Sequence, residues 1–268
     1  MCGIAGVLGR PLATTSVATA QHLLHRRGPD AQGVWQGTMR GQPLTLIHTR
    51  LSIIDLDPRA NQPFVTDRCV IVFNGEIYNY RELRDELSAT GTRFVTESDT
   101  EVLAAAYAAW GPGCVERFEG MWAFALFDRH DETLLLSRDP FGEKPLHHIT
   151  ANGVFSFASE PKALPVLSGE TLVPDYRQLR RYLVNGYKAL YKQPSGWFEN
   201  VAELPSGTSA TLTAPATPEP KAYWQLAYAP QPMSRTEAEA GARDRVRRAL
   251  ELRLRADVPV AFCLSGGV

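Results

Sequence analysis

The chain has 268 residues, of which 44% are hydrophobic and 21% are charged, so it can bury a substantial core. Its formal net charge of -1 gives no electrostatic case for binding nucleic acid or a membrane surface, and no apolar run reaches the roughly 18–20 residues of a membrane span. The four cysteines form neither a zinc-type pair nor a disulfide framework, so we expect no metal site and a cytoplasmic setting.

The N-terminal part of the chain alternates between strand-like and helix-like patterns. Residues 4–8 form a short apolar run that predicts a strand, and residues 14–26 have helical character. Residues 44–54 and 69–73 predict further strands, the second of the fully buried type. Residues 80–89 show the charged amphipathic pattern of a surface helix.

Another helix and a hairpin follow. Residues 98–101 fit a capping box, which predicts the start of an Ala-rich helix ending near residue 110. Apolar runs at 122–127 and 133–137, joined by a polar turn, predict a β-hairpin, and 154–158 predicts one more strand. This mixture favours a layered α+β domain that ends near residues 160–170.

The C-terminal part has a different character. Residues 205–233 are rich in Pro, Ala, Thr and Ser and predict a connector with a few short strands. A capping box at 234–237 opens a long helix to about residue 255. A buried strand at 258–264 then leads into a Gly-rich turn at 265–267, as at the opening of a nucleotide-binding unit. We expect the chain to be the front portion of a longer protein.

The second residue is a cysteine, and a small residue there predicts removal of the initiator Met1. Cys2 would then carry both a thiol and a free α-amine, whose reference pKa of roughly 7.7–8.0 leaves an appreciable fraction unprotonated near neutral pH. A nucleophile and its general base would thus share one residue.

Three further positions suit the hydrolysis of a small zwitterionic amide. Arg50 has the planar fork that matches a carboxylate, and Asp99, at the positive end of a helix dipole, would stay ionised for an ammonium. Asn74-Gly75 follows a buried strand and can aim a side-chain amide and a backbone N–H at an oxyanion. Each also has an ordinary interpretation: a surface arginine, an acidic helix start and a hairpin turn.

A series of motifs spans residues 2–164 in order: Cys2-Gly3-Ile4, Arg27-Gly28-Pro29-Asp30, Arg50-Leu51-Ser52-Ile53-Ile54-Asp55, Asn74-Gly75-Glu76-Ile77-Tyr78-Asn79, Ser98-Asp99-Thr100-Glu101, Arg138-Asp139-Pro140-Phe141-Gly142-Glu143-Lys144-Pro145-Leu146 and Phe157-Ala158-Ser159-Glu160-Pro161-Lys162-Ala163-Leu164. Together they resemble the class II glutamine amidotransferases, the N-terminal-nucleophile glutaminase family. Within it the chain is most similar to glutamine-hydrolysing asparagine synthetase.

This resemblance implies a four-layer αββα sandwich and a glutaminase site. Cys2 would be the nucleophile and its own α-amine the base, while Asn74 and Gly75 would donate to the oxyanion. The glutamine substrate would be held at both ends of its backbone: the α-carboxylate by Arg50 with backbone groups of Leu51, Ser52, Ile53 and Ile54, and the α-amine by Glu76 and Asp99.

The resemblance also implies a glutamine-hydrolysing carbon–nitrogen ligase with domains at 1–170 (glutaminase), 171–233 (extension and linker) and 234–268 (truncated start of an ATP-binding synthetase domain). Leu264 would contact the adenine nucleotide and Ser265, Gly266 and Gly267 its phosphates. ATP with Mg would serve the missing synthetase domain, while the glutaminase half needs no cofactor. The expected partners are glutamine and, in the full-length protein, aspartate or another carboxylate acceptor, with a homodimer as a candidate assembly.

Two departures leave the acceptor open. Arg26 stands where the family has His, and His147-His148 where it has two Tyr. The alternatives are an amidotransferase of the same architecture that acts on a sugar, peptide or antibiotic precursor, and a non-catalytic glutamine-binding module. The amidophosphoribosyl or hexosamine-forming branch shares the glutaminase half, but residues 264–267 speak against it.

Overall fold

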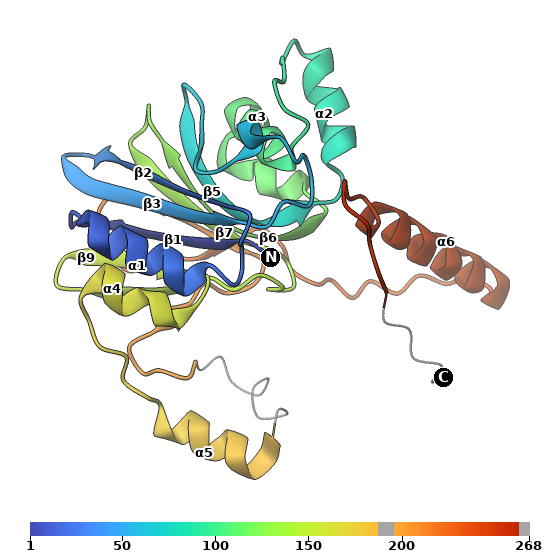
Figure 1. Ribbon diagram of the computed structural model, residues 1–268. Coiled ribbons are helices and arrows are strands. Elements are labelled where there is room, and N and C mark those ends of the chain that lie inside the picture. Colours follow the sequence, from blue (N-terminus) through green and yellow to red (C-terminus); the bar gives the residue numbers. More distant parts are fainter. Residues whose placement is uncertain (187–195, 263–268) are drawn as a thin grey trace.

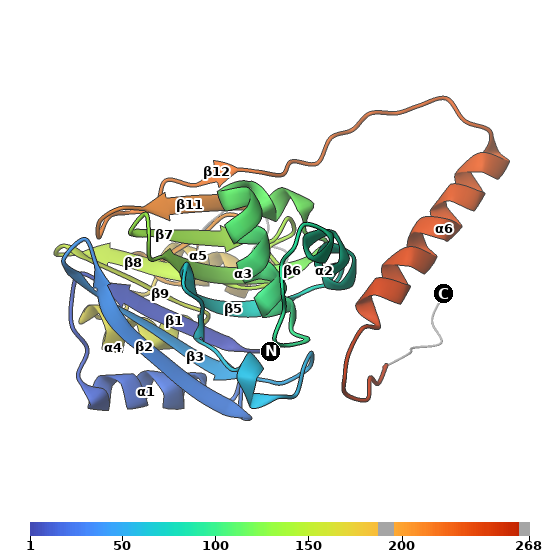
Figure 2. The ribbon, with the colours of Figure 1, turned by 90° about the horizontal axis from the view of Figure 1, so that it is seen from above.

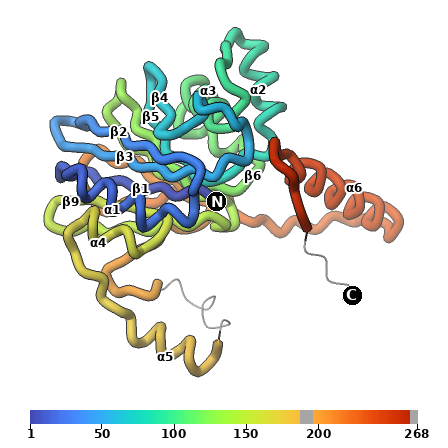
Figure 3. The backbone as a smooth tube through the Cα atoms, viewed as in Figure 1, coloured from blue at the N-terminus to red at the C-terminus, as the bar shows by residue number. Residues whose placement is uncertain are grey.

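A computed structural model describes residues 1–186 and 196–262 of the chain. Two antiparallel sheets, each of six strands, pack face to face, with helices on both outer faces (Figures 1 and 2). The backbone trace in Figure 3 shows the N-terminus near the ends of both sheets, so the first residues lie where the two sheets meet.

The first sheet has the N-terminal strand near its centre. Its order is β10 (Ala202–Glu203), β8 (His147–Ala151), β9 (Val154–Ala158), β1 (Gly3–Leu8), β3 (Gln42–Arg50) and β2 (Ala31–Met39). Gly3 lies opposite Thr49 on one side of β1, and Ala5 lies opposite Ala158 on the other. The position of Cys2 is therefore fixed by strands on both sides.

The second sheet carries the Asn-Gly motif on the strand next to one of its edges. Its order is β12 (Lys221–Ala222), β11 (Thr208–Leu212), β7 (Thr133–Arg138), β6 (Gly120–Asp128), β5 (Cys69–Ile77) and β4 (Phe64–Val65). β5 pairs with β6 along its whole length but with the short β4 only at residues 70–71, so the second half of β5 has a free edge.

Three apolar clusters hold the layers together. One lies between the sheets and includes Leu46 of β3 and Val72 of β5. Another packs α1 (Thr14–Leu24) and α4 (Leu164–Ser168) on the first sheet. The third packs α2 (Tyr80–Ala89) and α3 (Asp99–Trp110) on the second sheet, with Trp122 in it. This confirms the predicted four-layer αββα sandwich.

The remaining helices lie at the margins. Short 3-10 helices occupy Pro58–Ala60, Gly111–Arg117 and Pro161–Ala163. Helices α5 (Tyr176–Asn185) and α6 (Arg235–Arg253) extend away from the sandwich (Figure 1). Within the described ranges, no helix combines the length and apolar character needed to cross a membrane.

Several predicted elements are confirmed and three differ. The predicted strand at 44–54 is wrong beyond Arg50, where the chain leaves the sheet for a loop. The strand predicted at 69–73 continues to Ile77, so Asn74-Gly75 is not a hairpin turn. The strand predicted at 258–264 is not formed in its described part, and Val260 and Phe262 are 47% and 62% exposed. A buried strand needs neighbouring strands, and the described residues offer it none.

Candidate active site

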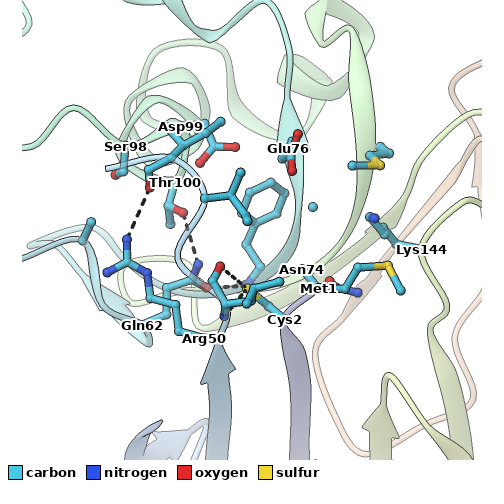
Figure 4. Close-up of a pocket in the computed structure, with 17 residues that line it drawn as sticks. Met1, Cys2, Arg50, Gln62, Asn74, Glu76, Ser98, Asp99, Thr100 and Lys144 are labelled. Carbon is cyan, nitrogen blue, oxygen red and sulfur yellow. Dashed lines mark hydrogen bonds between the residues drawn. The ribbon is translucent and has the colours of Figure 1, made fainter. Parts of the chain in front are cut away.

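A pocket of about 260 Å³ lies at the end of the sandwich where the chain begins, and Met1 and Cys2 line it (Figure 4). This is smaller than the roughly 300–1,000 Å³ typical of sites for drug-sized ligands, so it suits a small metabolite. The lining includes most of the residues predicted from the sequence: Cys2, Arg50, Leu51, Ile53, Ile54, Asn74, Gly75, Glu76 and Asp99.

Cys2 is held by its neighbours in the first sheet and by one arginine. Its Sγ lies 3.4 Å from the backbone nitrogen of Leu51, which donates to it, and Arg27 Nε donates to the Cys2 carbonyl oxygen at 2.9 Å. Arg27 in turn pairs with Glu160 at 3.3 Å. The thiol therefore stands at a fixed place beside the end of β3.

Burial shifts the pKa of two groups at the start of the chain, the Cys2 thiol and the Met1 α-amine. Burial raises the pKa of the Cys2 thiol, although the Leu51 N–H and the nearby terminal amine act to lower it. Burial also lowers the pKa of the Met1 α-amine. Both directions favour neutral groups near neutral pH. The amine described here belongs to Met1, whereas the predicted general base is the amine that Cys2 would carry once Met1 is removed.

The motif at 27–30 packs behind Cys2 and contacts the loop that follows β3. A Cβ on Gly28 would come within 2.2 Å of the Thr49 carbonyl oxygen, so only glycine allows this approach. Asp30 Oδ2 accepts the N–H of Ser52 at 2.7 Å. Ser52, predicted to bind substrate through its backbone, is thus engaged by Asp30 and is not among the lining residues.

The free edge of β5 presents backbone N–H groups to the pocket at alternate residues. Phe73 N donates to Gln62 Oε1 at 2.6 Å, and Ile77 N donates to Asp99 Oδ2 at 3.0 Å. Because backbone groups two residues apart on a strand point to the same side, the N–H of Gly75 faces this edge as well. A Cβ on Gly75 would lie 2.2 Å from the Met121 carbonyl oxygen, so glycine is also required for β5 to pair with β6 here.

The side chain of Asn74 is the clearest sign of a binding site. Asn74 is completely buried, yet among the described residues neither its Nδ2 nor its Oδ1 has a hydrogen-bond partner. An unpaired buried amide is costly, and native structures contain few of them. Because Asn74 also lines the pocket, we infer that a bound ligand supplies the missing partner.

Asp99 and Glu76 bring negative charge to the other end of the pocket (Figure 4). Asp99 is the first residue of α3, capped by Ser98, whose side chain accepts the Glu101 N–H. Burial, with a smaller effect of Glu76, raises the pKa of Asp99 to about 7. Burial thus acts against the expected effect of the helix dipole, which favours the ionised form of Asp99. Burial also raises the pKa of Glu76.

Arg50 is almost fully buried, and its terminal nitrogens already hold the loop after β3. Nη1 donates to the carbonyl oxygen of Asp57 at 3.1 Å and to Asn61 Oδ1 at 2.7 Å. Nη2 donates to the carbonyl oxygens of Ile54, at 3.3 Å, and Asp55. Arg50 thus shapes this loop as well as supplying positive charge. A ligand carboxylate would contact its Nε–H or replace one of these partners.

Gln62 and Lys144 are among the lining residues that had no role assigned from the sequence. Gln62 bridges β5 and α3, since its Nε2 donates to Thr100 Oγ1 at 3.2 Å while its Oε1 accepts from Phe73. Lys144 is buried and lines the pocket, and burial lowers its pKa. Gln62 offers no signal in the sequence. Lys144 belongs to the motif at 138–146, which could have drawn attention to it.

The motif at 138–146 folds around two buried side chains that place Lys144. Arg138 donates from Nε to the Lys144 carbonyl oxygen and from Nη2 to that of Gly142, both at 2.8 Å. Asp139 accepts the N–H groups of Phe141, Glu143 and Lys144, each at 3.0 Å. The motif is therefore explained by the geometry of this loop.

The predicted ATP contacts Leu264, Ser265, Gly266 and Gly267 lie outside the described residues. Within the described ranges, no group of three or more His, Cys, Asp or Glu side chains could hold a metal ion. Cys69 and Cys114 are buried free thiols.

The sequence matches the family model of the glutamine amidotransferase domain over residues 1–224. The chain belongs to this family. The resemblance inferred from the motifs is thereby confirmed, and the matched range ends just after β12, the last strand of the second sheet.

Relatives and solved structures agree with this assignment. The chain is 34% identical over 276 residues to asparagine synthetase (glutamine-hydrolysing) 1 of Bacillus subtilis, and 32% identical over 289 residues to the amidase chry2 of Gibberella zeae. Both alignments cover the whole chain but only 42% and 41% of those proteins. The glutamine phosphoribosylpyrophosphate amidotransferase of B. subtilis shares the fold, with a TM-score of 0.60 and 18% identity over 84% of this chain and 50% of that one.

Proposed function

We propose that the described sandwich hydrolyses L-glutamine to glutamate and ammonia. The observation that carries the proposal is the unpartnered, fully buried amide of Asn74 in the same pocket as the Cys2 thiol. The pocket also pairs a cation, Arg50, with two carboxylates, Glu76 and Asp99. That arrangement matches an α-amino acid whose side-chain amide reaches Cys2.

In the proposed reaction Met1 has been removed, so the α-amine belongs to Cys2. The amine accepts the thiol proton as Sγ bonds to the amide carbon of glutamine. Asn74 Nδ2 and the N–H of Gly75 donate to the oxyanion. The intermediate collapses by breaking the C–N bond, and ammonia leaves with the proton carried by the amine. Water then hydrolyses the thioester by the reverse use of the same groups, which releases glutamate and restores the thiol.

For the full-length protein we propose an asparagine synthetase, in which the ammonia reaches an aspartate carboxylate activated with ATP and Mg. The support is the similarity to the B. subtilis enzyme, of which this chain spans 42%. The residues proposed for ATP lie outside the described part, so no step through ATP is derived. A second candidate is an amidotransferase of the same architecture with an acceptor carboxylate other than aspartate, because the chain is also 32% identical to a protein named as an amidase and not as an asparagine synthetase.

The decisive test is ammonia release from L-glutamine by the purified chain, together with the intact mass of its N-terminus. We expect a mass without Met1, activity in the unmodified chain and none in Cys2→Ala. Cys69→Ala is the matched control, because Cys69 is a buried thiol outside the pocket, and it should retain activity. Activity that survives in Cys2→Ala, or full activity in a chain that keeps Met1, contradicts the mechanism.

A further inference from the structure

The chain that follows α6 turns back toward the sandwich (Figure 1), and there Arg255 contacts Glu82 of α2. We call residues 248–257 the return segment. It comprises the last turns of α6 and the residues after them, and it comes from the part of the chain beyond the matched range 1–224.

Ion pairs and hydrogen bonds anchor the return segment. Arg255 makes a two-pronged pair with Glu82, with both N–O distances at 2.6 Å, and donates to the Tyr78 carbonyl oxygen at 2.7 Å. Arg248 pairs with Glu119 at 2.8 Å. The pairing with Arg255 lowers the pKa of Glu82 to about 2, so Glu82 stays ionised over the pH range in which the enzyme would work.

Two residues beyond Arg255, Asp257 bonds directly to the loop that borders the pocket. Its backbone N–H donates to the Ile53 carbonyl oxygen at 2.9 Å. Its Oδ2 accepts the N–H of Asp55 at 2.7 Å. The two contacts lie on either side of Ile54, and both Ile53 and Ile54 line the pocket.

Two of these loop residues are also held by Arg50, which donates to the carbonyl oxygens of Ile54 and Asp55. Asp55 has φ of 54°, a left-handed conformation that non-glycine residues adopt only when their surroundings hold them. Its carboxylate is also engaged, since Oδ2 accepts the Glu97 N–H at 2.7 Å. The loop is therefore held both by the buried side chain of Arg50 and by the exposed side chain of Asp257.

We propose that Asp257 is a positioning residue for the glutamine site. By fixing Ile53 and Asp55 it sets the course of the loop whose backbone groups and Arg50 face the α-carboxylate end of the substrate. The inference rests on the proposed function. Asp257 lies outside the matched range 1–224, yet by this inference it helps the pocket to bind glutamine. The return segment would thus form part of the support of the glutamine site.

The test compares steady-state glutamine hydrolysis by the full 268-residue chain and three variants. Asp257→Ala removes the acceptor for Asp55 N–H and should raise KM for L-glutamine about tenfold, the scale of one hydrogen bond to a charged group, with kcat changed less than about twofold. Asp257→Asn keeps an oxygen acceptor and should restore most of the affinity. Glu251→Ala, an exposed position of the return segment on α6, is the matched control and should behave as the unmodified chain.

Hydrogen exchange of the Asp55 amide provides a readout that does not depend on catalysis. We expect faster exchange in Asp257→Ala and near-normal exchange in Asp257→Asn. An unchanged KM in Asp257→Ala overturns the proposal, as does equal damage in Asp257→Ala and Asp257→Asn or unchanged exchange at Asp55. If the unmodified chain releases no ammonia from glutamine, the proposed function fails. The exchange experiment still tests whether Asp257 holds the Asp55 amide.

Discussion

Binding of L-glutamine should release a proton from Asp99 at and below neutral pH. Burial raises the pKa of Asp99 to about 7, so we expect about half of the molecules to carry the neutral acid at pH 7 before glutamine binds. The α-ammonium of glutamine favours the carboxylate and lowers that pKa on binding. The apparent dissociation constant should therefore rise as the pH falls through about 7, by about tenfold between pH 8 and pH 6.

Calorimetry on Cys2→Ala, which binds without turnover, measures both quantities. Titrations in buffers of different ionisation enthalpy should give about half a proton released at pH 7 and nearly one at pH 6. Asp99→Asn should bind more weakly and lose this dependence. Glu76→Gln should keep it but shift its midpoint to lower pH, because the charge of Glu76 helps to raise the pKa of Asp99. An affinity that is flat between pH 6 and 8, or a dependence that persists in Asp99→Asn, refutes the reasoning.

Three further predictions concern turnover, acid stability and packing. Asn74→Ala should lower kcat by about 10²–10³ with little change in KM, as expected for a lost oxyanion donor, whereas Arg50→Ala should mainly raise KM, as steady-state kinetics will show. Burial lowers the pKa of His48 to about 3, so between pH 6.5 and 3 His48 binds a proton in the unfolded chain but not in the folded one. The free energy of unfolding should therefore fall by about 1.4 kcal/mol per pH unit as the pH falls through this range. Urea unfolding of His48→Gln should lack that part of the acid loss. Gly75→Ala should destabilise the fold by about 1–3 kcal/mol through overpacking and abolish glutaminase activity, since its Cβ would meet the Met121 carbonyl oxygen at 2.2 Å.

Local patterns in the sequence predicted a layered α+β fold, while most of the pocket residues were predicted from the resemblance of the motifs to the glutaminase family. Apolar runs indicated the strands, and the motifs named Cys2, Arg50, Asn74 and Asp99 before any contact between them was known. Asn74-Gly75 looked like a turn by local preference, but pairing with β6 keeps it in a strand. The hydrogen bonds between β5 and β6, which no local pattern encodes, determine that Asn74-Gly75 stays in the strand.

The loop after Arg50 could not be predicted for a similar reason. Residues 51–54 have strand-like composition, yet Arg50 and Asp30 draw their backbone groups away from the first sheet. Asp257, far away in the sequence, bonds to the same loop. Contacts over such separations depend on the completed fold.

Two buried aspartates illustrate why the sequence could suggest this site but only the structure could locate its function. Asp139 is fully buried, and the N–H groups of its own loop surround its carboxylate, so its role is to shape that loop. Asp99 is nearly as buried, but its carboxylate faces a pocket that also holds the unpartnered amide of Asn74. Burying a polar or charged group without enough hydrogen-bond partners lowers the stability of the fold. Such groups are therefore typical of sites where a bound ligand supplies the missing partners. The unpartnered amide of Asn74 and the buried carboxylate of Asp99 thus indicate the ligand that we propose: an ammonium group would lie at Asp99 and an amide at Asn74, within reach of Cys2.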